Sequence, residues 1–93
     1  MTVATLRVTM LIADCRSTRE KRRFMRAIME KLHRHFNVSV AEGDHDANPA
    51  QSDLTAVVVA PTRREAREIL ARVADAVAAH PRAELLCHAI HEV

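Results

Sequence analysis

The sequence predicts a small α+β domain built from two consecutive strand–helix–strand units. Four segments show the alternating or continuous apolar patterns of strands, and two segments place apolar residues at three- and four-residue spacing, as helices do. Each expected helix also follows a Ser or Thr with Glu three residues later, which is a capping signal. With 93 residues and 10.4 kDa the chain has room for one hydrophobic core, so we expect a single domain over residues 1–93.

The first strand is expected over residues 3–13, where one side is apolar and the other mainly polar. The two sides comprise Leu6, Val8, Met10 and Ile12 against Thr5, Arg7 and Thr9. Residues 36–42 alternate in the same way and predict a second strand. A period of two is typical of strands that bury one face.

The first helix is expected to begin after Ser17 and to end at about His35. In a capping box the Ser17 hydroxyl accepts a hydrogen bond from the Glu20 amide, while the Glu20 side chain reaches back. One face of this helix is apolar and comprises Phe24, Met25, Ile28, Met29, Leu32 and Phe36. Such a stripe predicts a helix that packs against a sheet.

The second half repeats the pattern after a polar loop at residues 43–53. Residues 54–60 form an apolar run typical of a central strand, which ends at Pro61. A second capping box, Thr62 with Glu65, opens a helix whose inward positions are Ala66, Ile69, Leu70, Val73 and Val77. Its outer face carries charges of opposite sign at four-residue spacing, namely Arg64, Glu68 and Arg72. This helix ends at His80-Pro81, and residues 84–92 close the chain as a fourth strand.

This order of elements predicts a ferredoxin-like βαββαβ sandwich, a four-stranded antiparallel sheet with two helices on one face. The other face would carry Thr5, Arg7, Thr9 and Ser39, which is neither fully polar nor fully apolar. Open faces and edge strands of this kind commonly pair with a second subunit, so we expect a homodimer.

Composition excludes several classes of protein. Two cysteines, Cys15 and Cys87, are too few and too distant for a disulfide scaffold. No signal peptide and no apolar run of about 18–20 residues is present, so we expect a cytoplasmic protein without a membrane span. Two Phe residues with no Trp or Tyr exclude functions that stack bases on aromatic side chains.

The charge is unevenly distributed. Residues 16–35 contain eight Lys and Arg against two Glu, whereas the whole chain has a net charge of only +2. Four arginines at helical spacing share the face opposite the apolar stripe, namely Arg19, Arg22, Arg23 and Arg26. Like charges four residues apart and cations near a helix N-terminus are both slightly unfavourable, which suggests that an anion binds there.

Two interpretations of this face remain open. The arginines can be a solvated surface, neutralised by acids of a neighbouring strand or subunit. Alternatively they bind the phosphate backbone of RNA, because guanidinium groups match phosphate oxygens in pairs. In that case Arg16 and Lys21 would lie at the rim, with the Lys21 stem packed and its amine in solvent. Binding would depend on charge and shape rather than on base identity.

Metal and catalytic sites receive little support. His88 and His91 are expected on opposite faces of the last strand, His33 and His35 on different sides of the helix, and no CxxC motif exists. Asp44, Asp46 and Asn48 imitate the start of an EF-hand loop, but Pro49 replaces the required Gly and Thr55 the required Glu. The cluster Asp44, His45, Asp46 and Asp53 is the main group suited to acid–base chemistry. We expect no metal, no cofactor, no small-molecule substrate and no enzymatic activity.

Two stretches resemble a known family. Ser17-Thr18-Arg19-Glu20-Lys21-Arg22-Arg23 is similar to the first helix start of the small YlxP-like bacterial proteins, and Phe36-Asn37-Val38-Ser39-Val40-Ala41-Glu42 matches one of their strands. The chain departs from that family at Thr18, where Leu is usual, and in the 43–53 loop, which lacks a Trp-containing segment. The resemblance implies a ferredoxin-like fold and a cytoplasmic bacterial protein. Genes of that family often lie beside translation-factor and ribosome-maturation genes, which points to RNA or ribosome contact.

The sequence therefore predicts a non-enzymatic accessory factor that binds RNA or the ribosome through the basic helix face. The alternative is a homodimeric protein-interaction module that acts through its open sheet face or edge strands. A small hydrolase or ligand sensor that uses the acidic loop is a third and weaker hypothesis.

Overall fold

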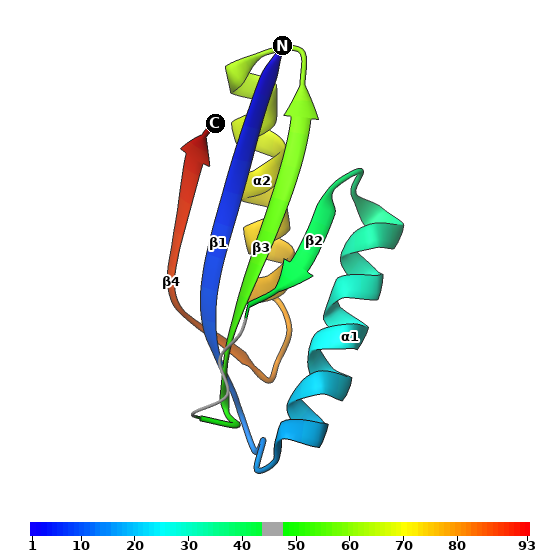
Figure 1. Cartoon of the computed structure of the whole chain (residues 1–93), viewed down its shortest axis with the longest axis vertical. Helices are drawn as coiled ribbons and strands as arrows, with labels where there is room; N and C mark the ends of the chain where they lie inside the picture. The colour runs from blue at the N-terminus through cyan, green and yellow to red at the C-terminus, as the bar shows by residue number, and fades with distance from the viewer. Residues whose placement is uncertain (44–47) are drawn as a thin grey trace.

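The computed structural model describes residues 1–43 and 48–93 and confirms the predicted ferredoxin-like βαββαβ order (Figure 1). The elements are β1 (Thr2–Ile12), α1 (Thr18–His35), β2 (Ser39–Glu42), β3 (Gln51–Ala60), α2 (Arg63–Ala78) and β4 (Ala83–Glu92). All four strands are antiparallel to their neighbours, in the order β2-β3-β1-β4. In Figure 1, α2 lies behind the central strands β1 and β3, whereas α1 lies beside the edge strand β2, on the side of the sheet away from β4.

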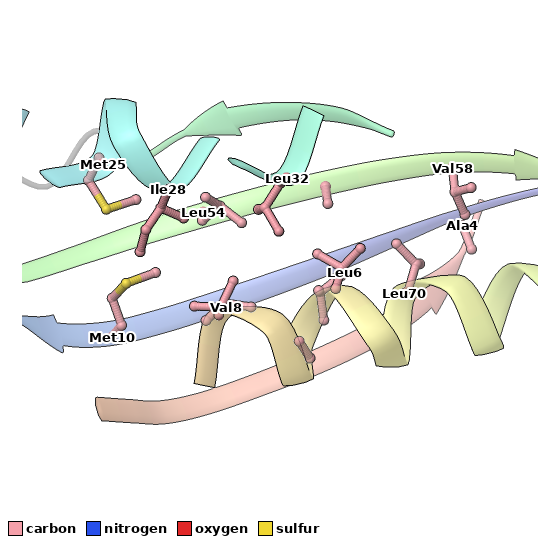
Figure 2. Close-up of a cluster of buried hydrophobic side chains, with 14 of the residues drawn as sticks. Ala4, Leu6, Val8, Met10, Met25, Ile28, Leu32, Leu54, Val58 and Leu70 are labelled. Carbon is pink, nitrogen blue, oxygen red and sulfur yellow. The ribbon is translucent and has the colours of Figure 1, made fainter. Parts of the chain in front are cut away.

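One hydrophobic core joins the two central strands to both helices. β1 and β3 pair from Thr2 with Ala60 to Leu11 with Gln51, and every second residue of each strand faces the helices. Helices and strands meet in one cluster of buried side chains, which Figure 2 shows around Ala4, Leu6, Val8, Met10, Met25, Ile28, Leu32, Leu54, Val58 and Leu70. The predicted alternation of β1 is therefore confirmed, with its polar positions on the open face.

The start of α1 follows the predicted cap with one difference. Ser17 is the N-cap, and its hydroxyl accepts a hydrogen bond from the Glu20 amide at 3.1 Å. The Glu20 carboxylate accepts from the backbone amide of Arg16 at 3.2 Å, one residue before the position that a capping box uses. The helix ends at His35, and the Phe36 amide donates to the Leu32 carbonyl as the C-cap.

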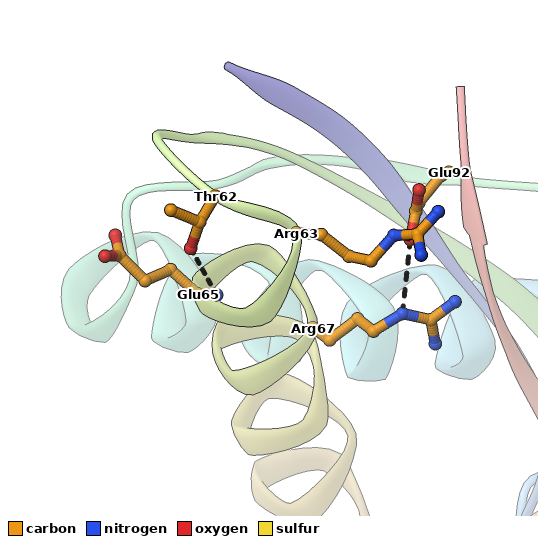
Figure 3. Close-up of polar contacts among 5 residues, drawn as sticks. All are labelled: Thr62, Arg63, Glu65, Arg67 and Glu92. Carbon is orange, nitrogen blue, oxygen red and sulfur yellow. Dashed lines mark hydrogen bonds and ion pairs between the residues drawn. The ribbon is translucent and has the colours of Figure 1, made fainter.

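The start of α2 is capped and tied to the end of the chain. The Thr62 hydroxyl accepts from the Glu65 amide at 3.2 Å, as predicted. Glu92, the last residue of β4, forms ion pairs with Arg63 at 2.6 Å and Arg67 at 3.3 Å (Figure 3). The predicted pairing along the helix is confirmed for Arg64 with Glu68, at 3.1 Å.

Strand boundaries differ from prediction where tertiary pairing determines them. β3 begins at Gln51, three residues before the apolar run, because Gln51, Ser52 and Asp53 pair with β1. β2 is shorter than predicted, because the chain at Phe36 still completes the helix end. In the part of the chain that the structure describes, no helix is long and apolar enough to cross a membrane.

Candidate functional site

The candidate site is an arginine strip on the first half of α1, defined here as Arg19, Arg22, Arg23 and Arg26. All four side chains are exposed, and with Thr18 they line an open hollow of about 620 Å³. Helical spacing brings them together, since residues three and four apart are neighbours on a helix surface. The opposite face of the same helix is held against the core by Phe24, Met25, Ile28 and Leu32, so the strip is fixed towards solvent.

No acidic side chain neutralises the strip within residues 1–43 and 48–93. In the ion pairs found there between arginine and carboxylate side chains, every arginine is in α2, and its partner is Glu68 of the same helix or Glu92 of β4. Glu20, the nearest acid in sequence, accepts a hydrogen bond from the Arg16 backbone amide. Glu30 follows Arg26 by one turn and forms no ion pair with any described residue. The two helices thus begin with similar sequences and differ in whether their arginines have carboxylate partners.

The uncompensated charge of the strip has a small energetic cost. Arg19 with Arg23, and Arg22 with Arg26, are like-charge pairs four residues apart, and each costs about 0.2–0.5 kcal/mol. The positive end of the helix dipole adds to this cost within the first turn. An anion bound over the hollow would relieve both effects.

Two predicted rim residues have different surroundings. Arg16 is exposed and lies immediately before the N-cap residue of α1. The prediction that the Lys21 amine reaches solvent is wrong, because Lys21 is only 4% exposed. Its Nζ donates to the backbone carbonyls of Asn48 and Gln51, both at 3.3 Å. Lys21 therefore links α1 to the start of β3 through hydrogen bonds, and it is not part of the candidate surface.

Thr18 is the lining residue that sequence analysis did not assign to the site. It is the first residue of α1 and lies one turn before Arg22, on the same side as the strip. The four-residue spacing from Arg22 is the signal that identifies it. A Thr hydroxyl adds a neutral hydrogen-bond donor to the four guanidinium groups.

The other predicted clusters are separated by the fold. His88 pairs with Val8 and His91 with Thr5, so the two imidazoles lie on opposite faces of the sheet. Asp53 lies in β3 opposite Thr9 and not in a loop. Its predicted companions Asp44, His45 and Asp46 lie outside the described residues, and so does the start of the EF-hand-like segment. In the described chain, no group of three or more His, Cys, Asp or Glu is placed to hold a metal ion.

Aromatic side chains are remote from the open face of the sheet. Phe24 is buried in the core, where its ring makes an edge contact with His80 at 4.7 Å and lies 5.3 Å from the Arg82 guanidinium. Phe36 caps the end of α1. The described strands therefore present no aromatic platform for stacking bases, and a surface of this kind can recognise only charge and shape.

Comparison with known proteins places the chain in a family. No curated protein matches the sequence. A family model described as "Protein of unknown function (DUF503)" matches residues 3–90, which is nearly the whole chain. That range includes every element of the fold except the ends of its first and last strands. The chain belongs to the DUF503 family.

Proposed function

We propose that this protein is a non-enzymatic cytoplasmic accessory factor that binds RNA or the ribosome through the arginine strip. The observation that carries the proposal is the set of four exposed guanidinium groups on one helix face without a carboxylate partner in the described chain. Arg16 extends this surface at the start of the helix, and Thr18 lines its hollow.

The chemistry of the strip suits phosphate groups. Each guanidinium can donate two parallel hydrogen bonds to phosphate oxygens, and arginine is favoured wherever this geometry is used. Arg19 to Arg26 covers two turns, or about 10 Å along the helix axis, which is enough for consecutive phosphates of one strand. Because the sheet lacks stacking aromatics, the proposed contact is to the backbone and independent of base sequence.

The choice of RNA rests on the resemblance to YlxP-like proteins as well as on the surface. Genes of that group often lie beside translation-factor and ribosome-maturation genes. Ribosomes display a dense phosphate surface, and a small protein with one basic strip can bind it without reading bases. Membership of the DUF503 family is compatible with this proposal and assigns no activity by itself.

The test is co-sedimentation with bacterial ribosomes and separated subunits at two salt concentrations. Four contacts to single-stranded RNA predict a log–log salt slope of about −3, which is a loss of about fifty-fold in affinity between 50 and 200 mM salt. Replacing Arg22, Arg23 and Arg26 with Glu should abolish binding while the fold is kept. The matched control replaces Arg7, Arg34 and Arg72 with Glu, which makes the same change in net charge at exposed positions outside the strip and outside the ion pairs of α2.

The outcomes separate the proposal from its alternative. Binding that falls steeply with salt and is lost only in the strip variant supports the RNA contact. Binding that ignores both salt and the strip substitutions contradicts it and favours a protein partner on the sheet. Loss of binding in both variants to the same extent also contradicts it, because net charge and not the strip would then be responsible.

A further inference from the structure

The two edges of the sheet are protected to very different degrees. β2 has only four residues, and a short edge strand gives a second chain little to pair with. β4 has ten residues, Ala83–Glu92, and contains no Lys, Arg or Pro; the features along it that discourage pairing are one bulge and the charges of Glu84 and Glu92. It forms the outer edge beyond β1 in the described sheet (Figure 1). Long edge strands without Lys, Arg or Pro are templates for pairing with another chain.

The backbone groups of β4 that point outward can be identified from its pairing with β1. The Val93 amide donates to the Val3 carbonyl at 2.9 Å, so Val93 is at a position whose backbone faces β1, and the pattern alternates along the strand. His88 pairs with Val8 in a position without such bonds, so the N–H and C=O of His88 point away from β1. The same holds for the other outward-pointing residues, Ala83, Leu85, Ile90 and Glu92.

One irregularity interrupts this row. The register between β1 and β4 shifts between Thr9 and Met10, so that Cys87 pairs with Thr9 and Leu85 with Met10. Leu86 is the extra residue, and it is 48% exposed. The bulge restores the same alternation on both sides, so that Glu84, Cys87, Ala89 and His91 all lie on the open face.

We infer that β4 is the dimer interface, where it pairs antiparallel with β4 of a second copy about a two-fold axis at His88. This register is the one in which the whole strand overlaps, with Ala83 opposite the partner's Glu92. It also brings the outward-pointing backbone groups face to face, because Leu85 then lies opposite the partner's Ile90 and His88 opposite the partner's His88. The bulged Leu86 stands outside the pairing in each copy.

Charge complementarity selects the same register. Glu84 lies opposite the partner's His91 on the open face, and symmetry repeats this pair at the other end of the interface. An imidazole N–H can donate to the carboxylate, and directly opposed residues of an antiparallel pair are in contact distance. A shift of the register by two residues in either direction keeps the open-face residues on the same face but no longer places Glu84 opposite the partner's His91. On the face of the sheet that carries the helices, apolar contact between Leu85 and the partner's Ile90 would stabilise the same register.

The interface and the arginine strip do not overlap. β4 lies at one edge of the sheet and α1 at the other, so pairing through β4 leaves both strips exposed (Figure 1). The dimer would contain a continuous eight-stranded sheet with four helices on one face. Dimerisation and RNA binding can therefore be tested independently, and failure of one leaves the other intact.

A cross-link through Cys87 tests the register in the unmodified protein. Cys15 is 6% exposed, whereas Cys87 is exposed on the open face of β4. In the proposed register Cys87 lies opposite the partner's Ala89, so the two Cys87 side chains are diagonal neighbours with Cβ atoms about 7 Å apart. A short bismaleimide should convert most of the protein to a covalent dimer, and Cys87→Ser should abolish the product. Absence of cross-linking at concentrations where sedimentation shows a dimer overturns the register.

Two variants test the backbone contacts at the axis. His88→Pro removes an N–H that points away from β1, and proline is tolerated in an edge strand at such a position. Because both copies lose a hydrogen bond at the axis, the dimer dissociation constant measured by sedimentation should rise about tenfold or more. His88→Ala keeps the N–H and should dimerise like the wild type. Equal effects of the two variants, in protein that circular dichroism shows to be folded, overturn the proposal.

A charge exchange tests the side-chain pair. Glu84→Lys should weaken the dimer on the order of tenfold, because two opposed pairs are lost. Adding His91→Glu restores pairs of opposite charge and should recover most of the affinity, whereas Glu30→Lys on α1 should have no effect. A wild-type protein that is monomeric at about 100 μM, or a double variant no tighter than Glu84→Lys, contradicts the proposed interface.

Discussion

The burial of Lys21 leads to a prediction about stability, which the substitution Lys21→Met tests. Met has a similar length and keeps the packing of the side-chain stem, but it cannot donate a hydrogen bond. In the native protein Nζ donates to the carbonyls of Asn48 and Gln51, both at 3.3 Å. The variant leaves these two carbonyls without that donor.

The expected loss can be estimated from the contacts. A hydrogen bond from a charged donor contributes about 1.5–3 kcal/mol, and bonds as long as 3.3 Å lie at the low end of that range. Two such bonds predict that the free energy of unfolding falls by about 2–4 kcal/mol. A domain of this length has a total stability of about 5–14 kcal/mol, so the loss is a large fraction of it. The melting temperature should fall by about 10–25 °C.

Urea unfolding followed by circular dichroism measures this loss. Lys31→Met is the matched control, since Lys31 is the other lysine of the chain and lies exposed on the same helix. The control should change stability by less than about 0.5 kcal/mol, as surface substitutions do. If Lys21→Met and Lys31→Met have equal stability, Lys21 is solvated in the native state, and the link between α1 and the start of β3 does not exist.

Two further substitutions probe the core and the first helix cap. Leu70→Ala, at a fully buried position between α2 and the sheet, should lower the free energy of unfolding by about 3–5 kcal/mol. Its control, Leu86→Ala at an exposed position, should lower it by less than about 1 kcal/mol. If urea titrations gave similar losses for the two variants, Leu70 would not be in the core. Ser17→Ala removes the acceptor for the Glu20 amide and should cost about 1 kcal/mol, or roughly 5 °C in melting temperature, whereas Ser39→Ala should not. An unchanged melting curve for Ser17→Ala would mean that this cap does not stabilise α1.

Local sequence patterns were sufficient to predict the fold and the position of the arginine strip. The caps at Ser17 and Thr62, the apolar stripes and the alternation of β1 all depend on residues a few positions apart. The strip depends only on helical spacing, so its exposure followed from the predicted helix. These features involve contacts of short sequence separation, for which propensity and periodicity are informative.

Features that depend on distant residues could not be predicted in this way. The burial of Lys21 depends on hydrogen bonds to Asn48 and Gln51, which lie 27 and 30 residues further along the chain, so local patterns did not reveal it. The early start of β3 at Gln51 depends on pairing with β1, and its polar residues gave no sign of a strand. The bulge at Leu86 likewise depends on the register with β1, and it determines which residues of β4 share a face.

The contrast between the two helix starts shows why tertiary position determines the candidate site. Both helices begin with a hydroxyl cap, an early Glu and several arginines, but the sequence of α2 also places Glu68 one turn after Arg64 on its outer face. At α2 the chain terminus places Glu92 of β4 against Arg63 and Arg67, which neutralises that face (Figure 3). At α1 no described acid occupies the equivalent position, and the neighbouring edge strand β2 has only four residues. The same local sequence pattern therefore stabilises the fold at one helix and leaves a surface suited to a polyanion at the other.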